Sequence, residues 1–232
     1  MRTIILHYHL FKNAGTSLDS ILKDNFGPAW VTNEFPMAGN DNTGQVEAWI
    51  AQNPSAIAFS SHTMVGPIPS PTGVHVVPVM MLRDPIARIR SAYRFERKQD
   101  ADTWGAQLAK EHDFEGYVRA RLERNGDRQC RNFQTSRLAS MAPGPEPELE
   151  RALVAAKQLH MTGMIGLVDG FGDALATLQR RVKPVFPAFE ASVTHKNVSS
   201  GTSASDTAAL DELLYESNHD DIELLSAVAS WG

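Results

Sequence analysis

The sequence has little cysteine: Cys130 is the only one among 232 residues. No disulfide can therefore form within the chain, a composition typical of proteins in reducing compartments. Long apolar runs are also missing, since no stretch approaches the roughly 18 residues that suggest a membrane-spanning helix. The apolar run near the N-terminus is short and is interrupted by His7 and His9, which does not fit a signal peptide. We expect a soluble, cytoplasmic protein without a membrane span.

An excess of positive charge is missing as well. Lys and Arg number 22 against 27 Asp and Glu, so the formal net charge is -5. An acidic chain is a poor candidate for binding the phosphates of nucleic acid, and we expect no such partner. Hydrophobic residues make up 42% of the chain, which is enough for a sizeable core. The length fits a single domain over residues 1–232.

What is present is an alternation of short apolar strands with helices. Residues 3–9 predict a strand, and a helix at 17–26 follows after a Gly/Ser/Thr turn. Residues 27–45 are rich in Gly, Pro and Asn and indicate a loop. Further elements follow: strands over 56–62, 74–82 and 161–168, and helices over 43–53, 85–99, parts of 103–141, 146–160, 172–182 and beyond 206. This alternation predicts an α/β fold with a mainly parallel sheet covered on both faces.

Two details of these elements have a physical basis. Pro78 lies inside the predicted strand 74–82 and cannot donate a ladder hydrogen bond. Either the strand begins at Val79 or a bulge falls at Pro78. Asp84 followed by Pro85 predicts a helix start, because Asp is a favoured N-cap residue and Pro is favoured at the first helical position.

The turn after the first strand reads KNAGTS over residues 12–17. The backbone N–H groups of such a turn form an anion site together with the dipole of the following helix. Lys12 comes three residues before Gly15, whereas the loop that binds nucleoside triphosphates has its lysine directly after the last glycine. The spacing alone leaves open a phosphate site and an ordinary turn with a surface lysine.

A second motif, RDPIARIRSAY, begins at Arg83. Arg83 would lie at the end of a strand, and Ser91 about two turns into the next helix. An arginine in this position suits a phosphate because its planar fork binds two oxygens at once. Alone, the motif is more typical of a basic surface helix with an Asp-Pro cap than of a phosphate site.

Taken together, the two motifs resemble those of the sulfotransferases that use 3′-phosphoadenosine 5′-phosphosulfate. FKNAGTS is similar to that family's 5′-phosphosulfate loop, and RDPIARIRSAY to its 3′-phosphate motif. The resemblance covers most of residues 3–225 and is strongest to the carbohydrate branch, which includes the heparan sulfate and uronyl 2-O-sulfotransferases. Three more segments are similar to that branch: FSSHTMVG, with Ser61 in place of the usual glycine, MTGMIGLVDGFGDALATL, and the polar loop THKNVSSG.

The resemblance implies a P-loop-like three-layer fold with a central, mainly parallel sheet flanked by helices. It also implies a donor, 3′-phosphoadenosine 5′-phosphosulfate, that needs no metal for transfer to a hydroxyl of a carbohydrate or small-molecule acceptor. Lys12 would stabilise charge on the leaving group. The other implied donor-binding residues are Asn13, Ala14, Gly15, Thr16 and Ser17 for the 5′-phosphosulfate, Arg83 and Ser91 for the 3′-phosphate, and Lys196, Asn197 and Ser199 for the nucleotide.

His62 is the candidate base, because it follows a strand and a neutral imidazole accepts protons near pH 7. Its position matches the catalytic histidine of the family. His7 and His9 share one face of the first strand, but the sequence offers no third ligand, so we expect no metal site. Six arginines lie between Arg119 and Arg137 and predict a solvated helix face or, alternatively, a platform for an anionic carbohydrate acceptor.

Two other functions stay open. A P-loop kinase of a small molecule would share the loop, but it requires a lysine after the glycine and a magnesium-binding acid at a strand end. A catalytically inactive nucleotide- or glycan-binding module would keep the same anion site without turnover. The nucleotide that binds, with or without magnesium, distinguishes these functions.

Overall fold

The computed structural model describes residues 1–36, 39, 41–192 and 207–231. Five strands form one sheet in the order β2-β3-β1-β4-β5, and each neighbouring pair is parallel. Their bounds are β1 (Arg2–Tyr8), β2 (Trp30–Thr32), β3 (Ala58–Ser61), β4 (Val74–Leu82) and β5 (Met164–Leu167). The predicted α/β fold with a central parallel sheet is confirmed.

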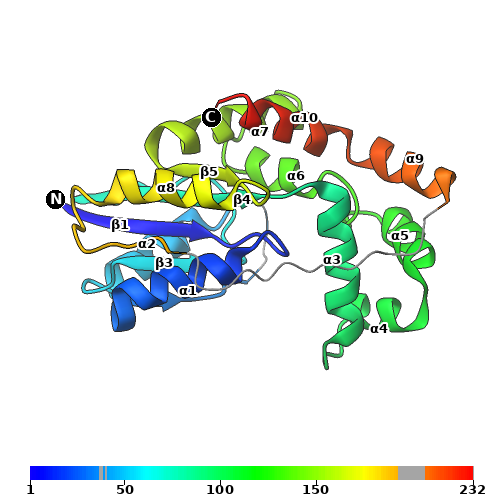
Figure 1. The fold of residues 1–232 in the computed structure, drawn as a ribbon, viewed down its shortest axis with the longest axis horizontal. Helices are drawn as coiled ribbons and strands as arrows, with labels where there is room; N and C mark the ends of the chain where they lie inside the picture. Colours follow the sequence, from blue (N-terminus) through cyan, green and yellow to red (C-terminus); the bar gives the residue numbers. More distant parts are fainter. Residues whose placement is uncertain (37–38, 40, 193–206, 232) are drawn as a thin grey trace.

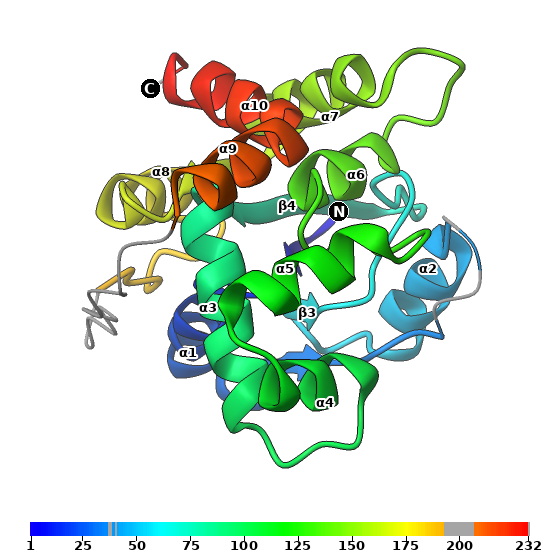
Figure 2. The ribbon, with the colours of Figure 1, turned by 90° about the vertical axis from the view of Figure 1, so that its right-hand side faces the viewer.

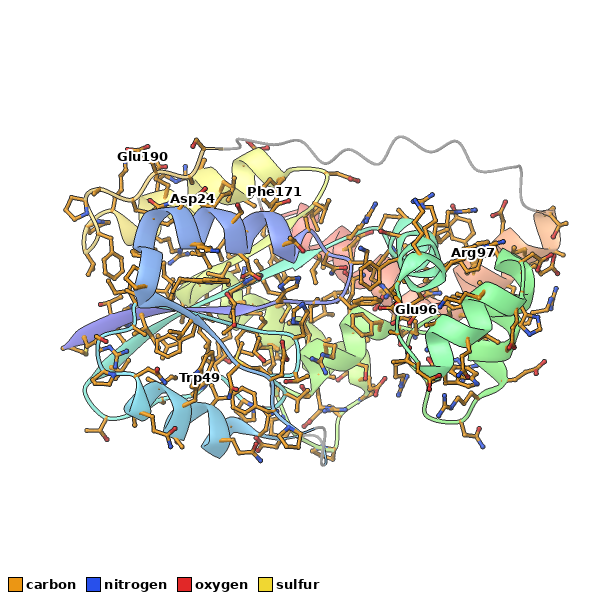
Figure 3. The ribbon with its side chains drawn as sticks, turned by 90° about the horizontal axis from the view of Figure 1, so that it is seen from below. Asp24, Trp49, Glu96, Arg97, Phe171 and Glu190 are labelled. Atoms are coloured by element: carbon orange, nitrogen blue, oxygen red, sulfur yellow. The ribbon has the colours of Figure 1, made fainter. Side chains whose placement is uncertain are left out.

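Helices cover both faces of this sheet, which gives three layers (Figure 1). Successive side chains of β1 point to opposite faces, so Leu6 joins one apolar cluster and Ile5 the other. The helices on the Ile5 face are α1 (Gly15–Phe26) and α8 (Phe171–Val182). Those on the Leu6 face are α2 (Thr43–Gln52), α6 (Phe133–Ala139), α7 (Glu148–Thr162) and α10 (His219–Ala229). Figure 3 shows Trp49 on one side of the sheet and Asp24 and Phe171 on the other.

A further group of helices lies beyond the carboxyl ends of the strands (Figures 1 and 2). It consists of α3 (Pro85–Lys98), α4 (Trp104–Glu111), α5 (Phe114–Glu123) and α9 (Ala208–Ser217). These helices bury an apolar cluster of their own, in which Tyr93, Tyr117 and Leu214 are at most 9% exposed. Asp84 caps α3 as predicted, because its carboxylate accepts the N–H of Ala87 at 2.7 Å.

Two expectations about the strands were wrong. Residues 27–45 were expected to form a loop, but they contain the three-residue strand β2, which pairs with β3. At Pro78, β4 runs through without a bulge, since Leu6 pairs with Pro78 in the same register as its neighbours. The pairing with β5 begins one residue later, at Val79. The backbone of Pro78 packs closely against Gly163, just ahead of that ladder.

The chain leaves β1 and β4 in different directions. β1 continues into α1 on one face, and β4 leads through α3 to α6 into α7 on the opposite face. Where two neighbouring parallel strands diverge in this way, a crevice opens at their carboxyl ends, and ligands of open α/β sheets bind there. No helix in the described part of the chain is long and apolar enough to cross a bilayer.

Candidate active site

The loop between β1 and α1 lies at this crevice. Lys12 and Ala14 adopt left-handed backbone conformations with φ of 65° and 59°. The turn leaves the N–H groups of Ala14, Gly15 and Thr16 without a partner among the described residues. Unpaired N–H groups at the start of a helix attract an anion, and the helix dipole adds to the attraction. The predicted anion loop therefore has the required backbone geometry.

Asn13 holds this loop from the inside. Its side chain is only 1% exposed, and its amide donates to the carbonyl of Met81 at 2.9 Å and to Gln134 Oε1 at 2.7 Å. Its backbone N–H donates to Leu10. Asn13 therefore shapes the loop rather than presenting a group to the crevice.

Gln134 at the start of α6 joins the two motifs. Its Oε1 accepts the backbone N–H of Arg83 at 2.8 Å, and its Nε2 donates to the Arg83 carbonyl at 2.8 Å. The carboxylate of Asp221 on α10 accepts from the backbone of Gln134 and Thr135 in turn. One buried amide thus fixes the end of β4 against the loop after β1. No local pattern indicates this role, because the partners of Gln134 are 51 and 121 residues away along the chain.

Three cationic side chains converge beside the loop. Nη1 of Arg83 donates to the carbonyl of Lys12 at 3.2 Å, and the amine of Lys12 lies 4.3 Å from the centre of the Phe95 ring. Burial lowers the pKa of Lys12, and the charges of Arg83 and Arg94 lower it further. Burial and Arg94 likewise lower the pKa of Arg83, against the opposing charge of Asp169. The repulsion between these like charges raises the free energy of the folded protein, and a bound anion would offset it.

Arg94 was missed by sequence reasoning, although its spacing offered a signal. It lies three residues after Ser91 on α3, so both occupy the same side of the helix. Ser91 is half-buried, and its hydroxyl makes no hydrogen bond within the described structure. The structure therefore adds Arg94 to the predicted pair of Arg83 and Ser91, as the third cation beside Lys12 and Arg83.

His62 follows β3 directly, and its side chain is half exposed. Its Nδ1 lies 2.6 Å from Oε1 of Glu34. Oε2 of Glu34 accepts the hydroxyls of Thr63 and Ser61 at 2.9 and 3.3 Å. Burial raises the pKa of Glu34, but the hydrogen bonds from His62 and Thr63 outweigh it and hold the pKa below its usual value. An ionised carboxylate requires Nδ1 to carry the proton, which leaves the lone pair on Nε2 of His62.

Glu34 was also missed, because it lies in the segment expected to be an unstructured loop. The short strand β2 brings it beside β3. Ser61, which replaces the glycine usual in the resembling family, uses its hydroxyl to bind Glu34 and to accept the N–H of Thr63. The substitution therefore supports the carboxylate that contacts His62.

His7 and His9 share one face of β1 as predicted, and the third group is Asp19 on α1. Nδ1 of His7 lies 2.7 Å from Oδ1 of Asp19, and Nδ1 of His9 lies 2.8 Å from Oδ2. The three side chains converge closely enough to be considered as ligands of a metal ion. However, each imidazole is hydrogen-bonded to a different oxygen of the Asp19 carboxylate. Two imidazole N–H donors on one carboxylate explain this geometry without a metal ion.

A pocket of about 620 Å³ lies beside α6 and does not include the anion loop among its lining residues. It is lined by Ser136, Arg137 and Ala139 of α6 and by residues within 39–41, 65–67, 121–133 and 140–151. Nη2 of Arg137 donates to the carbonyl of His62 at 2.6 Å, so this wall of the pocket adjoins the candidate base. The predicted arginine segment does not form one solvated face, because Arg121 and Arg128 also line the pocket.

Several candidates lie elsewhere. Lys196, Asn197 and Ser199 fall outside the described residues. Cys130 is packed at 1% exposure, and burial raises the pKa of its thiol to about 12, which makes it a poor nucleophile.

Comparison with known proteins identifies a relative and a solved structure that are similar to this chain. An uncharacterized protein from Archaeoglobus fulgidus is 40% identical over an alignment of 205 residues, which covers 85% of this chain and 80% of that protein. No protein-family model matches the chain. The crystal structure of a sulfotransferase from Alicyclobacillus acidocaldarius aligns with 98% of this chain and 96% of its own, at 15% identity and a TM-score of 0.44. A similarity at this level leaves the activity to be argued from the site.

Proposed function

The chain belongs to the same family as the Archaeoglobus fulgidus protein, whose name states no activity, and we propose from the site and its two motifs that it is a sulfotransferase. It would move a sulfuryl group from 3′-phosphoadenosine 5′-phosphosulfate to an acceptor hydroxyl. The observation that carries the proposal is the convergence of Lys12, Arg83 and Arg94 with the unpaired N–H groups of the loop, beside the His62–Glu34 pair.

The chemistry of this donor set fits a ligand with two separate anionic ends. The 5′-phosphosulfate would bind the N–H groups of Ala14, Gly15 and Thr16, with Lys12 over it. The hydroxyls of Thr16 and Ser17 are available at the same helix start. The 3′-phosphate would bind the side chains of Arg83, Ser91 and Arg94, at and beyond the start of α3. One guanidinium group can donate to two phosphate oxygens at once.

The roles of the reacting groups follow from their contacts. Nε2 of His62 would accept the proton of the acceptor hydroxyl, and Glu34 would stabilise the imidazolium that results. The hydroxyl oxygen attacks sulfur in line, and the bond from sulfur to the bridging oxygen of the 5′-phosphate breaks. Lys12 would stabilise the charge that develops on that oxygen, which leaves as part of adenosine 3′,5′-bisphosphate.

A magnesium-dependent kinase is less well supported by the same site. It requires a carboxylate at a strand end to hold the metal. Asp84, at the end of β4, uses its carboxylate as the N-cap of α3. Beside it the crevice presents cations, which hold an anion without a metal ion.

The acceptor would enter from the pocket beside α6. The pocket is lined by four arginines, at positions 121, 128, 137 and 151, and by three acids, Asp41, Asp127 and Glu148. The formal net charge of these side chains is +1. Arg128 already pairs with Glu148 at 2.8 Å. The lining suits a hydroxylated acceptor with a modest negative charge, and an anionic carbohydrate is one candidate.

The test is the unfolding midpoint with adenosine 3′,5′-bisphosphate in EDTA, compared with 5′-AMP and with ATP and magnesium. A ligand at 100 times its dissociation constant stabilises the fold by about 2.7 kcal/mol. We expect a large shift with the bisphosphate that is lost in Arg83→Ala and retained in Arg180→Ala, whose side chain is exposed on α8. A shift with ATP and magnesium alone would replace the proposal with the kinase. Bisphosphate binding without turnover on hydroxylated acceptors would favour the inactive module.

A further inference from the structure

We propose that His9, held by Asp19, is a positioning residue that fixes the imidazole of His62 against the anion loop. The inference rests on the proposed function, because it takes His62 to be the base. It assigns a purpose to the two buried histidines that share one face of β1.

The contact between the two histidines is close. The ring centroids of His9 and His62 are 3.9 Å apart, and the ring planes differ by 32°. The His9 side chain is 9% exposed, whereas that of His62 is 50% exposed. The backbone N–H of His9 also donates to the carbonyl of Ser61 at 3.0 Å, which ties the end of β1 to the residue before His62. His9 therefore forms the inner wall against which the exposed imidazole rests.

Asp19 fixes the orientation of that wall. One carboxylate oxygen accepts from His9 and the other from His7. Burial raises the pKa of Asp19, but the hydrogen bonds from the two histidines outweigh it, so the pKa lies well below its ordinary value. The carboxylate is thus ionised at neutral pH. It lies in the second turn of α1, the helix that the loop begins.

His9 also touches the loop itself. A Cβ at position 15 would lie 2.1 Å from Cδ2 and 2.4 Å from Nε2 of His9. Gly15 does not have a positive φ, so its backbone does not demand glycine. Glycine is needed here because the imidazole of His9 occupies the space that a side chain at position 15 would fill. His9 is therefore in contact with the loop and the base at once and is anchored on α1, a geometry suited to fixing the distance between donor and base.

The test compares His9→Ala and His9→Phe with His75→Ala, an exposed histidine near the start of β4. We expect His9→Ala to lower kcat about tenfold or more, since a misplaced base loses much of its effect. The dissociation constant of adenosine 3′,5′-bisphosphate should change less than about threefold, since the loop N–H groups and Arg83 remain. His9→Phe keeps the ring contact and should recover part of kcat. It also serves as the folded variant if His9→Ala does not fold.

A second readout does not depend on turnover. Relaxation of the ring ¹³C nuclei of His62 should show a more mobile imidazole in His9→Ala than in the wild type and in His75→Ala. If kcat stays within about twofold of the wild type, or the mobility of His62 is unchanged, the proposal is wrong. Loss of bisphosphate binding together with kcat would also overturn it, because His9 would then hold the loop and not the base. If the wild type binds no bisphosphate, the proposed function fails, while the relaxation comparison still decides whether His9 positions His62.

Discussion

Glu34→Gln removes one charge from the site and almost no volume. In the wild type, Nδ1 of His62 lies 2.6 Å from Oε1 of Glu34, a hydrogen bond to a charged acceptor. Such bonds contribute about 1.5–3 kcal/mol, against about 0.5–1.5 kcal/mol for neutral pairs. The difference, about 1–1.5 kcal/mol, is expected to appear when His62 becomes cationic in the transition state. Because Glu34 is half exposed, water screens its charge, and the lower end applies.

A loss of about 1 kcal/mol corresponds to about a fivefold fall in kcat. The assay is the rate of bisphosphate release at saturating donor, with Glu190→Gln as the control. Glu190 pairs with Lys183 at the end of the molecule away from α3 (Figure 3). The unfolding midpoint and the bisphosphate affinity should match the wild type within error. If Glu34→Gln has wild-type kcat, or loses affinity for the bisphosphate instead, the pairing of Glu34 with a catalytic His62 is refuted.

Three further predictions follow from individual contacts. Gly15→Ala forces a Cβ to 2.1 Å from the ring of His9 and should destabilise the fold by about 1–3 kcal/mol in denaturant titrations, whereas Gly172→Ala, with nothing within 4 Å, should not. The pKa of Asp19 lies below its value of about 3.9 in the unfolded chain, so the ionised carboxylate contributes fully to the free energy of unfolding above that pH and loses this contribution as the pH falls through the folded pKa. In Asp19→Asn, the free energy of unfolding measured against pH should therefore fall less steeply in acid than in the wild type. Lys12→Ala should lower kcat by about 10²–10³ and leave the unfolding midpoint nearly unchanged, and a variant that unfolds earlier would contradict this.

The alternation of strands and helices and the anion loop could be predicted because both leave a pattern in the local sequence. The apolar run of β1 and the KNAGTS turn identify themselves within about ten residues, and the Asp84–Pro85 cap fixes the start of α3. The strand β2 could not be predicted in the same way. Its three residues are too few to show a period, and its pairing with β3 depends on residues nearly 30 positions away.

The residues that complete the site were missed for a related reason. Glu34 and Gln134 act through side-chain contacts across 28 and 121 residues of sequence. Nothing near either position marks it as functional. The alternation of His7 and His9 did predict their shared face, but only the packing of α1 on that face supplies Asp19.

The hydrogen bonds of Gln134 have a consequence for the protein during its synthesis. Asn13 is made early, but Gln134, which fixes its side chain, and Asp221, which fixes Gln134, follow much later. About 200 residues separate Asn13 from Asp221, which takes about 10–40 s at 5–20 residues per second. Until then the ribosome-bound chain carries the anion-binding sequence without its fixed shape. We therefore expect the proposed nucleotide site to reach its final shape only after α10 docks.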